Sequence, residues 1–102
     1  MLCLAALVCI GAAPAAAQDY PTRDIQLVVG FPPGSGADVY ARFYGNKLQQ
    51  LSGRTVIVAN RPGVGGVLAA ETVARARPDG HTLFIGGAGT LASAPWLFKK
   101  PT

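Results

Sequence analysis

Cysteine and histidine are almost absent from this sequence, and their scarcity limits the chemistry open to it. Both cysteines lie within the first seventeen residues. A chain cleaved after Ala17 can therefore form no disulfide, no thiolate metal site and no cysteine nucleophile. His81 is the only histidine, and its place between a turn and a strand predicts an exposed side chain. Because Asp38, Glu71 and Asp79 are not spaced as a catalytic pair or a metal site, we expect no catalytic residue and no bound metal.

Charged side chains are also few, at 14% of the chain, while apolar residues make up 50%. This composition excludes a disordered polar tail and is typical of a folded domain. Nine Lys and Arg against five Asp and Glu give a net charge of +4, but the basic residues are scattered and form no dense run. We therefore expect no nucleic-acid binding. A mildly basic surface of this kind would tolerate anionic solutes nearby.

No apolar run reaches the roughly 20 residues that a membrane-spanning helix requires. The most apolar segment is Met1–Ala17, which has no charged side chain and has an apolar core at Leu2–Ile10. Gly11 and Pro14 then interrupt a helix, and Ala15–Ala17 forms an A-x-A cleavage site. We predict a cleaved signal peptide over residues 1–17 and therefore export, with a membrane anchor as the alternative. The absence of Lys or Arg before the apolar core departs from the usual signal pattern.

The chain from Gln18 onward alternates short β-branched runs with helical stretches. The first run, Ile25–Val29, is mostly apolar, as in a strand buried on both faces. Glycine and proline clusters mark the ends of these runs. We predict three strands, over Ile25–Val29, Thr55–Ala59 and Thr82–Ile85, and three helices, over Ala37–Leu51, Val67–Ala76 and Ser93–Phe98. Helices placed between strands by short connections favour an α/β fold, here a β-α-β-α-β unit with a parallel sheet.

Local signals support these helices and indicate which side chains they bury. Ser35 and Asp38 have the spacing of a capping box, and Gly53 suits the left-handed residue that ends a helix. Apolar residues at helical spacing indicate the packing face of the first helix: Tyr40, Tyr44, Leu48 and Leu51. The second helix is expected to bury Leu68, Ala69, Thr72, Val73 and Ala76. Near the end of the chain, we expect two aromatic side chains in the core, Trp96 and Phe98.

Each predicted strand ends in a glycine-rich loop, and such loops meet at the carboxyl edge of a parallel sheet, where ligands of open α/β folds bind. The first loop, Phe31–Ala37, runs directly into a predicted helix, whose first turn has unpaired N–H groups and a partial positive charge. Glycine also lets a ligand approach the backbone closely. We predict that this loop binds a small anion, either a carboxylate or a phosphate. The alternative, that the glycines only permit tight turns, stays open, especially for Gly86–Thr90.

Nucleotide-binding motifs are missing from these loops. A P-loop requires a second glycine five places after the first and then a lysine, but Ser35 stands five places after Gly30 and no lysine follows. In Gly63–Leu68, a leucine stands where a dinucleotide fingerprint needs glycine or alanine. We therefore expect no nucleotide ligand.

Four blocks of sequence occur in an order that is more specific than any one block alone: Tyr20–Ile25, Phe31–Asp38 with Ala41-Arg42, Asn60–Gly66 and Pro78–Leu83. Together they resemble the substrate-binding receptors of tripartite tricarboxylate transporters, also called the Bug receptor family. The third block is similar to the family's Asn-Arg-Pro-Gly-Ala-Gly-Gly and the fourth to its Pro-Asp-Gly-Tyr-Thr-Leu. The chain departs from the family after the third loop, where Leu91 and Ala94 replace the His and Asn of a His-Ala-Ile-Asn-Pro segment.

The resemblance implies that residues 18–102 are the amino-terminal part of domain I of a two-lobed periplasmic binding protein, with the second lobe absent. It implies no catalysis and no cofactor, a monomer, and two partners: a small carboxylate solute and the membrane subunits of a tripartite transporter. Backbone N–H groups and waters would hold the carboxylate. The family's ligand contacts carry over to Phe31, Pro33, Gly34, Ser35, Gly36, Ala37, Asp38, Gly65, Gly66, Gly87, Gly89 and Thr90.

Two other functions remain open from the residues alone. One is a small exported α/β enzyme acting on a phosphorylated or anionic substrate, and the other is an exported interaction module without a small ligand. Three strands of a larger sheet bury little apolar area, and small domains are marginally stable even when complete. We therefore expect the chain by itself to be loosely folded and to bind carboxylates weakly or not at all.

Overall fold

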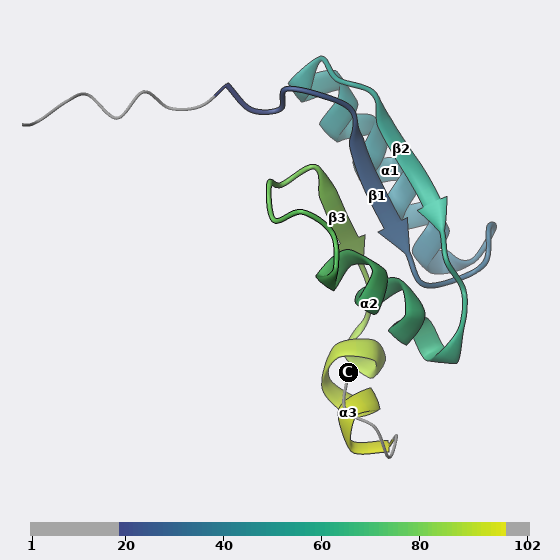
Figure 1. Cartoon of the computed structure of the whole chain (residues 1–102). Helices are drawn as coiled ribbons and strands as arrows, with labels where there is room; N and C mark the ends of the chain where they lie inside the picture. The colour runs from purple at the N-terminus through teal and green to yellow at the C-terminus, as the bar shows by residue number, and fades with distance from the viewer. Residues whose placement is uncertain (1–18, 98–102) are drawn as a thin grey trace, which may run out of the picture.

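A computed structural model describes residues 19–97, so the predicted signal peptide, both cysteines and Phe98 lie outside the described residues. Three strands and three helices alternate along the chain (Figure 1): β1 Ile25–Val29, α1 Gly36–Ser52, β2 Val56–Asn60, α2 Val67–Ala74, β3 Thr82–Ile85 and α3 Ala94–Leu97. A 3-10 turn, Val64–Gly66, precedes α2, and a π turn, Gly89–Ser93, precedes α3. Within residues 19–97, no helix has the length and apolarity to cross a membrane.

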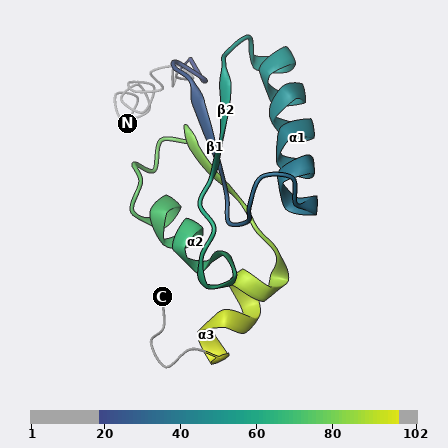
Figure 2. The same ribbon diagram turned by 90° about the vertical axis from the view of Figure 1, so that its right-hand side faces the viewer.

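The three strands form one parallel sheet in the order β2-β1-β3, which confirms the predicted α/β fold. Leu27 of β1 pairs with Val58 of β2 on one side and with Leu83 of β3 on the other. Helices α1 and α2 lie on opposite faces of this sheet (Figure 2). Ile25 and Val28 are almost fully buried because β1 is central and covered on both faces, which explains its nearly continuous apolar sequence.

The local signals place the described element ends to within two residues. Helix α1 begins and ends one residue outside the predicted Ala37–Leu51, and α3 begins at Ala94 instead of Ser93. β1 and β3 have the predicted bounds, whereas β2 begins and ends one residue later, and α2 ends two residues earlier, at Ala74. Ser35 caps α1 as predicted, because its Oγ accepts a hydrogen bond from Asp38 N at 3.3 Å, and Gly53 ends the helix with φ 69°. The Asp38 carboxylate does not return this bond to Ser35. It accepts one from Gly34 N instead, at 2.9 Å.

The packing face of α1 differs from the predicted one. The predicted side chains are exposed or only half-buried: Tyr40, Tyr44, Leu48 and Leu51. Ala41 and Gly45 face the sheet instead, and both are buried. A Cβ at Gly45 would lie 3.3 Å from a methyl group of Val56 and 3.6 Å from one of Leu27. The helix therefore lies so close to the sheet that only small residues fit between them, and the large side chains are displaced toward solvent.

Helix α2 also buries fewer residues than predicted. Ala69 is fully buried, but the other predicted residues are exposed or half-buried: Leu68, Thr72, Val73 and Ala76. The cause is a close contact between the end of β1 and the start of α2. A Cβ at Gly30 would lie 2.6 Å from Gly66 Cα and 3.4 Å from Ala69 Cβ. This contact determines which side of the short helix faces the sheet.

His81 is buried, at 5% exposure, so the predicted exposure is wrong. Its Nε2 accepts a hydrogen bond from Thr22 N at 3.0 Å, and the Tyr20 ring packs on it with 5.0 Å between ring centres. The segment before β1 thus lies over the start of β3. Thr22 and His81 are 59 positions apart, and no local pattern predicts a contact over that separation.

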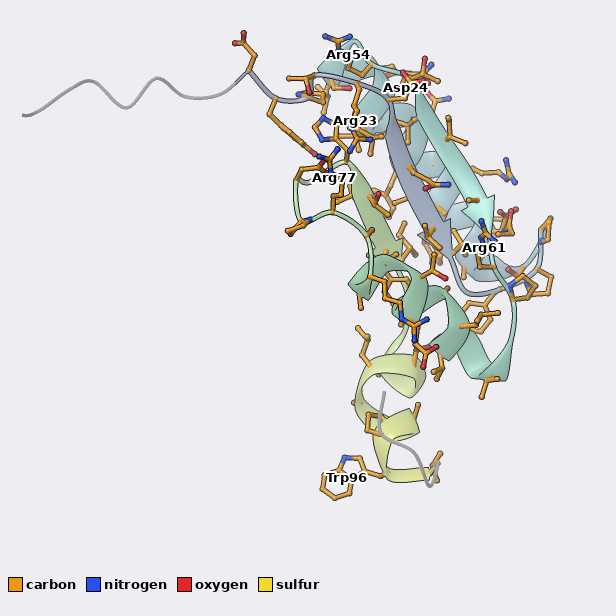
Figure 3. The ribbon with its side chains drawn as sticks, viewed as in Figure 1. Arg23, Asp24, Arg54, Arg61, Arg77 and Trp96 are labelled. Carbon is orange, nitrogen blue, oxygen red and sulfur yellow. The ribbon has the colours of Figure 1, made fainter. Side chains whose placement is uncertain are left out.

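Trp96 is 89% exposed, so the core position predicted for it is wrong. It points away from the remainder of the described chain (Figure 3). Helix α3 has only four residues and buries the small Ala94 on its inner side, which leaves the larger side chains outside.

Candidate functional site

The loops that follow the three strands meet at one edge of the sheet, as its parallel arrangement requires (Figure 1). Two open cavities lie there. The first, which we name the α1 cavity, has a volume of about 640 Å³ and is lined by Phe31, Gly36, Ala37, Tyr40, Tyr44, Phe84, Ile85, Gly86 and Gly87. The second, the α3 cavity, has a volume of about 330 Å³ and is lined by Phe31, Val64, Gly65, Gly87, Gly89, Thr90, Ala94 and Leu97. Phe31 and Gly87 border both, so the two cavities lie side by side.

The predicted ligand residues fall into two groups. Seven of them line the cavities: Phe31, Gly36, Ala37, Gly65, Gly87, Gly89 and Thr90. Five line neither cavity: Pro33, Gly34, Ser35, Asp38 and Gly66. The structure therefore brings together residues from all three loops, while the middle of the first loop lies outside both cavities. Contact with a ligand stays a prediction for all twelve.

The N–H groups of the first loop are not equally available. Those of Gly34, Ser35 and Asp38 donate hydrogen bonds within the loop, at 2.9 to 3.3 Å. Those of Gly36 and Ala37 have no partner among residues 19–97, and both residues border the α1 cavity. Unpaired N–H groups in the first turn of a long helix, at its positive end, suit a negatively charged group. Within the first loop, Gly36 and Ala37 are therefore the residues whose N–H groups are available to the predicted anion.

Asp38 lies directly behind these residues in the first turn of α1 and is 3% exposed. Arg42 Nε, Gly34 N and Asn60 Nδ2 each donate a hydrogen bond to its carboxylate at 2.9 Å. These bonds, with that from Arg42 the strongest influence, lower the pKa of Asp38 from 3.8 to about 2. The carboxylate is therefore ionised at neutral pH and faces donors of the protein.

Thr90 joins the second and third loops. It is 5% exposed, and its Oγ1 donates a hydrogen bond to Gly65 O at 2.6 Å. Gly66 adopts φ 90°, and a Cβ there would lie 2.7 Å from Thr90 Oγ1. The absence of a side chain at Gly66 therefore permits close contact between two loops, which is a structural role.

Neither cavity is lined by a charged side chain within residues 19–97. Arg23, Arg54 and Arg77 lie at the opposite, amino end of the sheet, whereas Arg61 directly follows β2 at the loop edge (Figure 3). Arg61 lines neither cavity. Arg42 is bound to Asp38. An anion inside either cavity would therefore meet backbone N–H groups and no charged lining side chain of the described residues.

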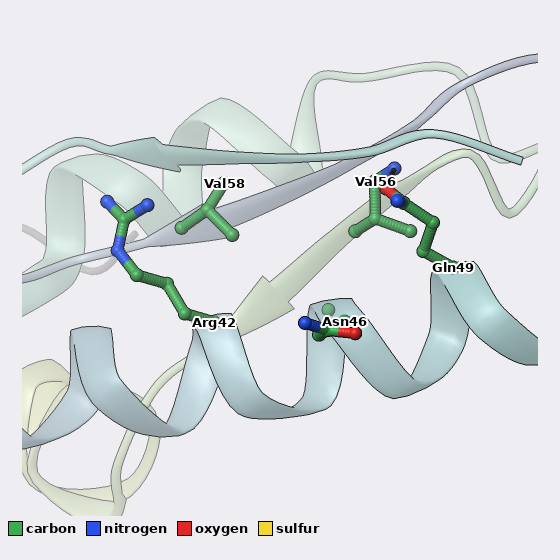
Figure 4. A pocket seen from close by; sticks show the side chains of 6 residues that line it. Arg42, Asn46, Gln49, Val56 and Val58 are labelled. Carbon is green, nitrogen blue, oxygen red and sulfur yellow. Dashed lines mark hydrogen bonds between the residues drawn. The ribbon is translucent and has the colours of Figure 1, made fainter.

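A separate groove of about 260 Å³ lies between α1 and β2, lined by Arg42, Gly45, Asn46, Gln49, Val56 and Val58 (Figure 4). Gln49 Oε1 accepts a hydrogen bond from Val56 N at 3.1 Å, and this bond joins the α1 side of the groove to the β2 side. The groove runs along the outer edge of the sheet and includes no residue of the three loops.

Sequence reasoning alone misses the walls of the α1 cavity. Tyr40 and Tyr44 fit the packing face of a helix, and Phe84 fits a buried strand, so none of them indicates a site. The available signal is the spacing of small residues, since Ala41 and Gly45 are four positions apart and mark the side that approaches the sheet. With that side assigned to packing, the two tyrosines lie next to it, at the rim of the cavity.

Comparison with known proteins identifies the family. Residues 40–101 match the profile of the tripartite tricarboxylate transporter family receptor, TctC. This chain belongs to the TctC receptor family. BugT of Bordetella pertussis is 46% identical to it over 74 residues, which are 72% of this chain and 23% of BugT. A UPF0065 protein of Bordetella bronchiseptica is 42% identical over 93 residues, 91% of this chain and 28% of that protein.

Solved structures share this TctC fold. MatC of Rhodopseudomonas palustris, with bound malate, is 41% identical with a TM-score of 0.75 and matches 79% of this chain and 28% of MatC. An R. palustris protein with adipate is 39% identical with a TM-score of 0.68, over 70% of this chain and 24% of that one. BugD, a periplasmic binding protein, is 38% identical with a TM-score of 0.61, over 64% and 22%. The chain thus spans about a quarter of the length of these relatives. The family and these solved relatives are receptors rather than enzymes.

Proposed function

We propose that this chain forms part of the ligand-binding lobe of a periplasmic receptor that captures a small carboxylate for a tripartite tricarboxylate transporter. One observation carries the proposal: Gly36 and Ala37 present unpaired N–H groups at the start of α1, beside a cavity at the loop edge. Membership of the TctC family supports a receptor. A phosphate-processing enzyme has no comparable support from the family or from the solved relatives, which are receptors.

The chemistry of the loop edge favours a carboxylate. Two N–H groups in one helical turn can donate to the two oxygens of a carboxylate, and the helix dipole adds a favourable field. Malate and adipate, the ligands of two solved relatives, are both dicarboxylates. The seven predicted ligand residues that line the cavities are the contacts we propose: Phe31, Gly36, Ala37, Gly65, Gly87, Gly89 and Thr90.

In the proposed function, residues 1–17 direct export and the receptor acts as a monomer in the periplasm. Closure of a second lobe over the carboxylate would produce the form that the membrane subunits recognise. A ligand drives such a closure only to the extent that it binds the closed form more tightly than the open one. Residues 18–102 would supply one side of that clamp, which agrees with the open cavities at the loop edge.

Gly36→Pro tests this function by deleting one of the two N–H groups. Ser35 is extended, with φ −69° and ψ 163°, which suits a residue before proline, and a Cβ at Gly36 meets nothing within 4 Å. Proline is also well tolerated at the first position of a helix. We therefore expect the variant to fold while its affinity for malate or adipate falls about tenfold, the value of one hydrogen bond to a charged group.

Gly36→Ala is the matched control, because it adds a Cβ but keeps the N–H group. The affinities are measured by calorimetry in a chimera in which this chain replaces the matching segment of MatC, and by NMR shifts of the Gly36 and Ala37 amides in the same chimera. The proposal fails if the folded chimera binds neither acid, or if Gly36→Pro binds as tightly as Gly36→Ala. NMR shifts confined to the groove between α1 and β2 would also contradict it.

A further inference from the structure

Three polar side chains behind the loop edge form a closed ring, which we name the Asp38 ring. Asp38 Oδ2 accepts from Arg42 Nε at 2.9 Å, and Asp38 Oδ1 accepts from Asn60 Nδ2 at 2.9 Å. Arg42 Nη2 completes the ring by donating to Asn60 Oδ1 at 3.4 Å. Asp38 and Arg42 lie on the first two turns of α1, and Asn60 ends β2. The ring therefore links the helix that begins at the site to the neighbouring strand.

The ring also binds the first loop at two points. Gly34 N donates to Asp38 Oδ2 at 2.9 Å, and Asn60 Nδ2 donates to Phe31 O at 3.0 Å. Phe31 begins the loop and Gly34, with φ 85°, lies in its middle. Between them these bonds fix the path of the backbone into α1, and with it the position of the two free N–H groups that follow. None of the three ring side chains lines either cavity at the loop edge.

The charges argue against direct contact between Asp38 and an anionic ligand. Two like charges at contact distance repel, and the repulsion is stronger where water is excluded. Arg42 forms an ion pair with Asp38 at 2.9 Å and so offsets the negative charge within the ring. A buried ionised carboxylate so close to an anion site is tolerable only in this paired form.

We propose that Asp38 and Asn60 are positioning residues for the carboxylate site, which act through the first loop without touching the ligand, and that Arg42 neutralises the ring. This inference rests on the proposed function for the identity of the ligand. It assigns Asp38 a role different from the ligand contact that the family resemblance implies. If Asp38 positions the loop, neutralising its side chain should weaken ligand binding. If only its charge mattered, the same change should tighten binding.

Asp38→Asn separates the two effects. Removing a negative charge near an anion site would tighten binding if charge dominated, whereas loss of the ring would weaken it. In the MatC chimera, we expect affinity for malate to fall about tenfold and hydrogen exchange of the Gly34 amide to accelerate about tenfold. Asn60→Ala changes no charge and should weaken malate binding in the same direction.

Asp79→Asn is the matched control, since Asp79 also accepts bonds from an arginine and from a backbone N–H, but at the opposite end of the sheet. We expect it to leave malate affinity and Gly34 exchange unchanged. Tighter or equal binding by Asp38→Asn would overturn the inference, and so would an equal loss in Asp79→Asn. If the parent chimera binds no dicarboxylate, the proposed function fails, while Gly34 exchange in Asp38→Asn and Asn60→Ala still decides whether the ring holds the loop.

Discussion

Asp38 and Asp79 have similarly lowered pKa values, and hydrogen bonds from the protein are the cause in both cases. The two residues lie at opposite ends of the sheet. Asp38 is held to about 2 by Arg42, Gly34 and Asn60, and Asp79 is held to about 2 by the His81 N–H and then by Arg23. Asp38 lies behind the loop edge and Asp79 lies at the far end of the sheet. Both carboxylates accept hydrogen bonds from groups of the protein, so a lowered pKa does not by itself identify a ligand contact.

Both carboxylates should make the stability of the folded chain depend on pH in the acid range. A pKa that is lower in the folded chain than the usual 3.8 means that the folded state favours the ionised form. Their stabilisation is therefore present above about pH 4 and is lost as pH falls toward 2. We expect the thermal midpoint by circular dichroism to drop across this window, and the drop to be smaller in Asp38→Asn and in Asp79→Asn. An unchanged pH profile in both variants would contradict the assignment.

Two glycines with similar positive φ angles should respond differently to substitution by alanine. Gly34 and Gly66 have φ 85° and 90°, so each substitution brings the same backbone strain, of about 1 kcal/mol. A Cβ at Gly34 meets nothing within 4 Å, whereas one at Gly66 would lie 2.7 Å from Thr90 Oγ1. We expect Gly66→Ala to cost at least about 1 kcal/mol more than Gly34→Ala in urea unfolding, because overpacking adds to strain. If both substitutions lower the free energy of unfolding equally, Thr90 can move away from the added methyl group without cost, and the prediction is wrong.

At the scale of elements, α1 is defined by the small residues that it turns toward the sheet. Ala41→Leu should cost about 1–3 kcal/mol, because the larger side chain has no space between helix and sheet. Phe43→Ala is the control on the exposed side, since Phe43 is 58% exposed, and we expect a change within about 0.5 kcal/mol. Urea unfolding measures both. A larger loss for Phe43→Ala would mean that the exposed side of α1 is covered in solution.

The element scale also shows what the sequence could predict. The bounds of β1 and β3, the Ser35 cap and the Gly53 end follow from local chemistry, namely β-branched runs, a hydroxyl acceptor and a left-handed turn. The face of α1 does not, because hydrophobic periodicity favours large side chains whereas close packing against a sheet requires small ones. The burial of His81 depends on a segment 59 positions away, which no window of sequence contains.

The location of the candidate site could be predicted from the sequence, but its detailed contacts could not. Parallel topology alone indicates that the three glycine-rich loops meet, and they do. Which N–H groups stay free could not be predicted, since that depends on how Ser35 and the Asp38 carboxylate use the others. The hydrogen bonds of Arg42 and Asn60 to Asp38 and to each other depend on a contact between a helix and the next strand. Side chains that act through tertiary contacts are therefore the part that pattern reasoning omits.

At the scale of the whole molecule, the described chain leaves much apolar surface uncovered. Large side chains on α1 and α3 are more than half exposed, among them Tyr40, Phe43, Tyr44, Trp96 and Leu97. Apolar surface of this extent is typical of a face that contacts other protein. We expect the full chain alone to bind a hydrophobic dye and to unfold over a broad temperature range, whereas the MatC chimera should bind little dye and unfold sharply. A sharp transition without dye binding in the chain alone would contradict this.

The contact of Gly66 with both Gly30 and Thr90 has a kinetic consequence. It fastens the connections after β1, β2 and β3 to one another, so under the proposed function a solute would meet loops that are already held together. Less ordering at encounter should favour fast capture, with little rearrangement of this half. Under the proposed function, a slow step would belong to closure of the proposed second lobe, and mutations that loosen Gly66 or Thr90 should slow association more than they hasten release.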